Sequence, residues 1–434
     1  MKIKTIEKPY EQVMALPKAK KVKPKKPSVF FRTLVRILSQ SELKKARFTF
    51  TGQIDKKGGP YLILMNHSSF IDLKIAHKIL YPMPFSIVCT HDALVGKKWL
   101  MRNIGCIPTR KFVSDIALIN DMRYALSKKK TSVLMYPEAG YSFDGKTTTL
   151  PENFGRLLKI LDVPVVFIKT QGAFHRDPLY NGLQIRKVPV SANVQTLLTR
   201  EQIKQATLEQ LNKVIENAFS FDNFLWQKEQ KISVDEPFRA DGLERIIYRC
   251  ANCNTEGKMK GEGTTLTCNH CGKSYTLTEF GELKARDGET EFSHIPDWYE
   301  WERKMVREEL LSGKYQLDVD VDIGIMLDYK ALYMVGKGKL KHTLDGFELV
   351  GCDGKLNYKQ KAIASYGLNA DYFWYEIGDV ICIGDNNALY YCFPPKEVPV
   401  AKTRLATEEL YKIHRINASC VKKTEKGKAL PNGI

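Results

Sequence analysis

The sequence predicts an α/β fold with a mixed sheet, followed by a four-cysteine segment and a β-rich C-terminal domain. Between about residues 61 and 230, short apolar runs alternate with helical stretches, as they do in α/β domains. After residue 315, apolar and polar residues alternate one by one, which is typical of half-buried strands. The chain has 434 residues, 43% of them hydrophobic and 27% charged, enough for several cores. This composition excludes disorder as the main state.

Positive charge is concentrated at the N-terminal end. The chain carries 67 basic and 49 acidic residues, a net charge of +18, and this favours an anionic partner. Residues 1–27 hold nine Lys and two Glu, and residues 29–50 hold five basic residues and Glu42, so eleven of the eighteen excess charges lie here. Pro24 and Pro27 exclude a stable helix, and we expect residues 1–27 to be a disordered basic arm.

Residues 28–48 predict an amphipathic helix. Phe30, Leu34 and Leu38 share a helical face, with Arg32 and Arg36 opposite. The helix could pack on the next domain as an ordinary surface helix, or it could lie in an anionic membrane surface, which the neighbouring lysines favour.

Cellular location follows from what the chain does not carry. The longest apolar runs are far short of the roughly eighteen residues of a membrane-spanning helix, and the first 27 residues have no secretory signal. The ten cysteines show no disulfide spacing. We therefore expect a cytoplasmic protein, peripheral on the inner face of the cell membrane.

The most informative segment, residues 66–72, directly follows the apolar run from Tyr61 to Met65. His67 is suited to proton transfer near neutral pH, and a carboxylate on its far nitrogen would fix its tautomer. Five residues are about 500° of helical turn, so His67 and Asp72 cannot share a helix face. They can meet if His67 is in the loop and a helix starts at Ser68 or Ser69, with Asp72 in its first turn. The alternative is that Asp72 only caps this helix.

Two further segments follow apolar runs of the same domain, residues 49–230. Arg110 and Lys111 are adjacent cations after a turn at Gly105, as a phosphate site requires. Glu138, followed by Gly140, comes after an apolar strand and Pro137, where α/β folds bind ligands.

In this order, the three segments resemble the glycerolipid acyltransferase family, also called the lysophosphatidic acid acyltransferase or PlsC-like family. The family motif N-H-x4-D is matched by Asn66, His67 and Asp72, and a G-x-I-x-x-x-R-like motif, one residue shorter, by Gly105, Ile107 and Arg110. The motif F-P-E-G-T-R-S is matched by Pro137, Glu138 and Ser142, and a V-P-[IV] strand by Val163, Pro164 and Val165. Tyr141 stands where the family has Arg, so one phosphate-binding cation is missing, for which Lys111, Lys146 or Arg176 could compensate.

The resemblance implies acyl transfer from acyl-CoA or acyl carrier protein to a glycerolipid hydroxyl, with 1-acyl-sn-glycerol-3-phosphate as the expected acceptor and other lysophospholipids as alternatives. His67 would be the general base, and Asp72 would orient it. Arg110 would hold the acceptor phosphate and Glu138 the glycerol backbone, while Asn66, Gly105, Lys111 and Gly140 complete the expected substrate site.

Cysteines predict a metal site in residues 245–285. Cys250, Cys253, Cys268 and Cys271 form a C-x2-C-x14-C-x2-C array. Four thiolates make a closed tetrahedral zinc site, which leaves no position for a substrate, so we expect structural zinc. Zinc ribbons also bind nucleic acid, but the basic charge lies far from this segment, and nucleic acid is the less favoured partner.

Residues 290–416 predict a helix at 296–311, then a β-rich module similar to a pleckstrin-homology-like domain, closed by a helix near 408–415. We expect residues 417–434 to be a basic tail.

Overall fold

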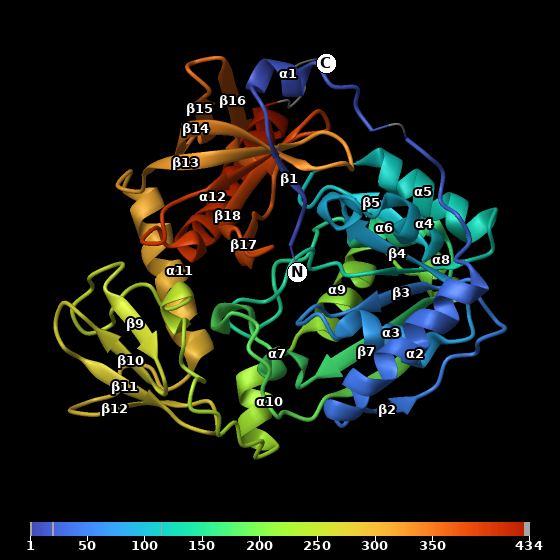
Figure 1. Ribbon diagram of the computed structural model, residues 1–434, viewed down its shortest axis with the longest axis horizontal. Coiled ribbons are helices and arrows are strands. Elements are labelled where there is room, and N and C mark those ends of the chain that lie inside the picture. Colours follow the sequence, from blue (N-terminus) through green and yellow to red (C-terminus); the bar gives the residue numbers. More distant parts are fainter. Residues whose placement is uncertain (1, 20, 114, 429–434) are drawn as a thin grey trace, which may run out of the picture.

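The computed structural model describes residues 2–19, 21–113 and 115–428, with side chains up to residue 416. Figure 1 shows three parts: an α/β part with the lighter blue to green segments, a small yellow β part, and an orange to red β-rich part, against which the dark blue N-terminal segment lies. Among the described residues, no helix is long and apolar enough to cross a membrane. An α/β part, a small four-cysteine part and a β-rich part follow one another along the chain, which confirms the predicted fold class.

The α/β part is built on a seven-stranded mixed sheet. Its order is β2-β8-β7-β3-β6-β4-β5, and only the pair β7–β8 is antiparallel. The strands are β2 (Thr49–Gly52), β3 (Leu62–Met65), β4 (Phe85–Thr90), β5 (Cys106–Thr109), β6 (Ser132–Met135), β7 (Val165–Gln171) and β8 (Ser191–Leu198).

Both faces of this sheet are covered by helices. Leu62 and Leu64 of β3 pack in one core and Ile63 and Met65 in another, because successive side chains of a strand point to opposite faces. The helices are α2 (Val29–Lys45), α3 (Asp72–Leu80), α4 (Lys98–Asn103), α5 (Ile116–Ser127), α6 (Phe154–Leu161), α7 (Ala173–Arg176), α8 (Arg200–Gln205), α9 (Leu208–Phe219) and α10 (Asn223–Glu229). Residues that follow the parallel strands therefore meet at one edge.

The four-cysteine segment forms a small antiparallel sheet. Its strands are β9 (Met259–Glu262), β10 (Thr265–Cys268), β11 (Ser274–Leu277) and β12 (Leu283–Ala285), in the order β12-β11-β10-β9. Helix α11 (Ile295–Leu311) follows and leads to the β-rich module, as Figure 1 shows. Pro296 near its start is favourable, because the first N–H groups of a helix have no partner inside the helix.

The β-rich module is an antiparallel sheet of seven strands in the order β16-β15-β14-β13-β19-β18-β17. They are β13 (Leu317–Met326), β14 (Leu332–Thr343), β15 (Gly346–Gly351), β16 (Leu356–Lys361), β17 (Asn369–Trp374), β18 (Gly378–Gly384) and β19 (Leu389–Phe393). Helix α12 (Val400–Lys428) packs against α11, β17 and β18. The pleckstrin-homology likeness stays a prediction.

The prediction of a disordered N-terminal arm is wrong. In the arm, β1 (Thr5–Glu7) pairs in parallel with β14, and a short helix α1 (Tyr10–Met14) buries Val13. The arm is ordered because its backbone finds a strand partner that composition does not reveal. At the other end, α12 continues to Lys428 through most of the predicted tail, and residues 429–434 lie outside the described residues.

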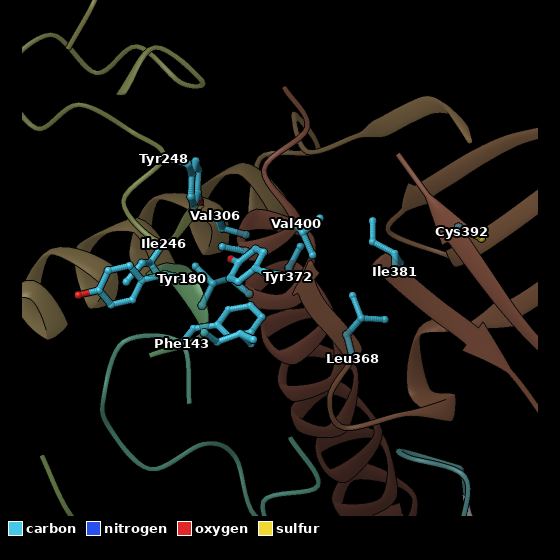
Figure 2. Close-up of a cluster of buried hydrophobic side chains, with 14 of the residues drawn as sticks. Phe143, Tyr180, Ile246, Tyr248, Val306, Leu368, Tyr372, Ile381, Cys392 and Val400 are labelled. Atoms are coloured by element: carbon cyan, nitrogen blue, oxygen red, sulfur yellow. The ribbon is translucent and has the colours of Figure 1, made fainter. Parts of the chain in front are cut away.

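One hydrophobic core joins the three parts. Phe143 and Tyr180 of the α/β part, Tyr248 before the ribbon, Val306 of α11 and Val400 of α12 belong to the same cluster. Figure 2 shows Phe143 directly below Tyr372 of β17, beside α12. The C-terminal module is thus packed firmly against the α/β part.

Candidate active site

His67 and Asp72 meet at the end of β3. The Asp72 Oδ2 atom lies 3.1 Å from His67 Nδ1, and Asp72 is fully buried while the His67 side chain is 21% exposed. Because an ionised carboxylate only accepts hydrogen bonds, Nδ1 carries the proton and Nε2 is the basic nitrogen. The described residues give Nε2 no hydrogen-bond partner. The pair therefore has the arrangement of an oriented general base.

The helix begins later than predicted. Helix α3 starts at Asp72, not at Ser68 or Ser69, and no capping box forms. The same Asp72 Oδ2 atom accepts hydrogen bonds from the N–H groups of Ser68, at 2.8 Å, and Ser69, at 3.1 Å. These bonds fold residues 67–71 into a loop ahead of the helix, while the Ser69 hydroxyl bonds to Asp177. Asp72 thus both shapes the loop and orients His67.

Two tyrosines enclose the imidazole. The ring of Tyr136 stacks on His67 with centroids 4.1 Å apart, and the ring of Tyr141 lies 4.2 Å away. Burial lowers the pKa of His67 below its ordinary value of 6.5, while the hydrogen bond and charge of Asp72 raise it and the charge of Lys111 lowers it. When the pH falls, this imidazole is therefore protonated at a lower pH than the imidazole of a solvated histidine.

Glu138 and Asn66 form hydrogen bonds that fix the loop around His67. The two carboxylate oxygens of Glu138 accept the N–H groups of His67, at 2.8 Å, and Thr148, at 3.1 Å. Burial raises the pKa of Glu138 to about 7, against the lowering effect of these two bonds. The Asn66 amide exchanges hydrogen bonds with the backbone of Thr170 on β7. Both side chains therefore position the His67 loop, and their expected roles as substrate contacts stay a prediction.

The four cations named from the sequence have different surroundings. The charge of Lys111 acts on His67, whereas Arg110 lines a separate cavity near Arg102 and His91. Lys146 pairs with Asp222 and Asp297, and Arg176, almost fully buried, pairs with Asp177 and Glu42. Of these four cations, Lys111 is the one whose charge acts on the pKa of His67.

The two expected glycines also differ in setting. Gly105 has φ +97°, and a Cβ there would lie 2.5 Å from the Pro27 ring, so this glycine admits the N-terminal arm. Its expected place in the substrate site stays a prediction. A Cβ at Gly140 would meet nothing within 4 Å, so there is open space beside Tyr141.

Comparisons with known proteins found one family model and similar solved structures. The family model named Acyltransferase matches residues 47–168, which contain His67, Asp72, Arg110 and Glu138. Residues 47–168 form an acyltransferase domain. A similar solved structure is that of the 1-acyl-sn-glycerophosphate (LPA) acyltransferase PlsC from Thermotoga maritima, with 16% identity and a TM-score of 0.35 over 43% of this chain and 76% of that one. Among curated proteins, none matches the chain.

The C-terminal module contacts the loop that carries Tyr141. Arg404 of α12 donates a hydrogen bond to the carbonyl oxygen of Tyr141, at 3.2 Å, and its guanidinium lies 4.2 Å from the centre of the Phe143 ring. Tyr372 of β17 also packs against Phe143, with 4.6 Å between the centres of the two rings. The loop that carries Tyr141, next to His67, is therefore in contact with a module outside the family match.

The four cysteines gather as the spacing predicts. Their sulfur atoms all lie within 4.8 Å of one another, with 3.8 Å between Cys250 and Cys271 and 3.7 Å between Cys253 and Cys268. In a tetrahedral site with Zn–S bonds of about 2.3 Å, sulfur atoms are about 3.8 Å apart. The donor set and its geometry fit zinc.

Sequence reasoning missed Tyr136 and Tyr141 as neighbours of His67, and Asp177 as the partner of Ser69. The replacement of the family's Arg by Tyr141 was the available signal, but it was interpreted as a lost cation. The ring contact depends on how residues 139–145 fold back, and that is set by Arg404 and Tyr372, far along the chain.

Proposed function

We propose that the protein transfers a fatty acyl group from acyl-CoA or acyl carrier protein to the hydroxyl of a glycerolipid. The observation that supports this best is the buried Asp72 on Nδ1 of His67, with Nε2 left unbonded in the acyltransferase domain. A general base with a fixed tautomer is what activation of an alcohol requires.

In this proposal, His67 Nε2 takes the proton of the acceptor hydroxyl as its oxygen attacks the thioester carbonyl. Asp72 stabilises the imidazolium that forms. The thiolate leaves and takes a proton, which the imidazolium can return. The N–H groups of His67, Ser68 and Ser69 already bond to carboxylates, so the oxyanion of the tetrahedral intermediate needs other donors.

For the acceptor, we propose 1-acyl-sn-glycerol-3-phosphate, which would give phosphatidic acid. Lys111 is the cation that supports this choice, because its charge reaches His67, and the phosphate of this acceptor lies on the carbon next to the reacting hydroxyl. The ammonium of a single Lys is a point charge, whereas the guanidinium of the family's Arg can donate two parallel hydrogen bonds to a phosphate. Acceptors with other polar headgroups are therefore the alternative.

We also propose that α2 lies in a membrane surface. The exposed side of α2 is its apolar side: Phe30 is 67% and Leu38 69% exposed. The polar side faces inward, where Arg36 lies over the Tyr81 ring, 4.2 Å from its centre, and Arg32 bonds to the carbonyl of Pro82. An ordinary surface helix has the opposite arrangement, so this orientation supports peripheral attachment to an anionic leaflet.

For the cysteine site, we propose structural zinc. Cys250, Cys253, Cys268 and Cys271 would hold the ion, and a closed site of this kind supplies folding free energy, not chemistry. Cys250 and Cys268 belong to the core shared with α11 and α12, so loss of the metal would loosen the module that contacts Tyr141.

The proposal is tested by incubating the purified protein with acyl-CoA or acyl carrier protein and a panel of lysophospholipids, then analysing products by mass spectrometry. Phosphatidic acid from lysophosphatidate is the expected product. A different acylated lipid would change the acceptor, and absence of any acylated product with every pair would contradict acyl transfer.

A further inference from the structure

A cavity of about 280 Å³ lies at the β5 edge of the sheet, away from His67. One wall is the N-terminal segment 21–24, and the others are residues 91–94, α4 and the start of α5. Tyr329 of the C-terminal module closes it. None of the groups that surround His67 is among its lining residues, so this is a second site in the molecule.

The cavity is lined by an excess of positive charge. Five cations and two carboxylates face it, namely Lys21, Lys23, Lys98, Arg102 and Arg110 with Asp115 and Asp121. The Asp115 carboxylate already accepts the N–H of Ala117 at the start of α5. Burial lowers the pKa of the nearby His91 to about 3, and Arg110 adds to this effect, so His91 is neutral. Within the described part of the chain, none of the five cations forms an ion pair with a carboxylate.

Three of these cations are held in place by contacts other than ion pairs, and the charges of Lys21, Arg102 and Lys23 also act on the Asp121 carboxyl. The Lys23 ammonium lies over the Tyr124 ring and that of Lys98 over the Tyr329 ring, each 5.0 Å from the ring centre. The Arg102 guanidinium donates to the carbonyl oxygen of Lys23, at 2.9 Å. Groups that are fixed but still charged form a preorganised site for an anion, and the geometry of guanidinium favours phosphate.

The anion is not the phosphate of an acceptor at His67. Strand β5 is the third strand from β3, so the backbones of these two strands, which lead to Arg110 and His67, are about 14 Å apart across the sheet. In a lysophosphatidate, the phosphate and the reacting hydroxyl lie on adjacent carbons. In an acyl donor, by contrast, the long pantetheine arm separates the thioester from the phosphates. This step rests on the proposed function, because it takes His67 as the reacting centre.

We propose that this cavity is a binding site for a phosphate ester outside the catalytic centre. Two sources of this chemistry fit. One is the phosphate end of a CoA-type acyl donor, for the reason of distance. The other is a phospholipid headgroup, because Lys98 and Arg102 line the cavity while Trp99, on the other side of α4, is 69% exposed and packs on Phe31 of α2.

The test is calorimetric titration of the full-length protein with CoA, adenosine 3′,5′-bisphosphate and inorganic phosphate, and vesicle sedimentation with phosphatidylcholine alone or with phosphatidate. We expect Lys98→Gln/Arg102→Gln to weaken binding of at least one phosphate ester by about tenfold or more, since charge-assisted bonds are lost. Lys21→Gln/Lys23→Gln should do the same if the first variant is unstable. Lys128→Gln, at an exposed residue directly after α5 and outside the cavity, is the matched control and should change nothing.

The arms separate the sources. Binding of CoA that adenosine 3′,5′-bisphosphate competes for assigns the acyl donor, and binding of phosphatidate vesicles alone assigns a headgroup. No binding of any probe, or equal binding by both double variants and the control, would overturn the proposal. His67→Ala should bind the probes normally, so this result does not depend on whether acyl transfer is observed.

Discussion

At His67, a carboxylate and two aromatic rings act on the imidazole in opposite directions. Asp72 favours its protonated form, and burial between Tyr136 and Tyr141 disfavours it. The net effect lowers the pKa of His67, which keeps the base unprotonated over a wider pH range.

Tyr141→Ala tests this balance. Opening one side of the imidazole removes part of the burial, so the pKa of His67 should rise toward its ordinary value and the acid limb of the kcat/KM profile should move to higher pH. Rates across pH 4–9, about the range in which histidines titrate, give the measurement. An unchanged acid limb would mean that Tyr141 does not set the basicity of His67.

Asp72→Asn separates charge from shape. Asn can still accept the N–H bonds of Ser68 and Ser69, but it cannot stabilise an imidazolium, so we expect a large loss of kcat with little change in melting temperature. Activity assays and thermal unfolding on the same preparation decide between the roles. Near-normal activity with lowered stability would reduce Asp72 to a structural residue.

The site could be predicted in part from the sequence. The spacing of His67 and Asp72 and their position after an apolar run were sufficient to expect their contact, because both are local in the chain. The use of Glu138 could not be predicted, since its two partners, His67 and Thr148, come from separate loops. The surroundings of Arg110 could not be predicted either, because the cavity that it lines is formed by several separate elements.

At the scale of elements, α2 and the N-terminal arm show what local pattern can and cannot predict. The helical spacing of Phe30, Leu34 and Leu38 correctly predicted α2. Which face points outward depends on α3 and Tyr81, and so the sequence left both alternatives open. The order of the arm depends on β14, more than three hundred residues away.

Phe30→Ser/Leu38→Ser should reduce binding to anionic vesicles by about tenfold or more, because it removes apolar area that would be buried in the interface. Ile363→Ser, at a residue of the C-terminal module that is apolar and 44% exposed, is the control. Lys25→Gln/Lys26→Gln should weaken binding at low salt only, since salt screens this attraction. Equal binding of all variants in vesicle sedimentation would remove α2 and the arm from the membrane contact.

On the scale of the whole molecule, the ribbon and the C-terminal module share a core with the acyltransferase domain. Arg303 of α11 pairs with Glu408 and Glu409 of α12, and Arg404 of α12 reaches the Tyr141 loop. The order of the three parts was predictable from changes in pattern along the chain. Their packing was not, because it is made by isolated residues such as Phe143 and Tyr372.

Removal of the proposed zinc tests this connection. Cys250→Ser should lose metal and solubility and lower the melting temperature strongly, because a structural metal contributes directly to folding free energy. Cys352→Ser, outside the cluster, should bind as much metal as the unaltered protein. Metal analysis and thermal unfolding give the comparison. A metal-free protein that stays folded but becomes inactive would contradict a structural role.

The central claim is that His67 is the base of an acyl-transfer reaction. The most direct test is the initial rate of acyl transfer by the unaltered protein and by His67→Ala, measured with the same donor and acceptor and accompanied by melting temperatures. We predict a loss of roughly 10²–10⁴-fold for His67→Ala with nearly unchanged unfolding, as removal of a general base produces. Equal rates for the two proteins would contradict the claim.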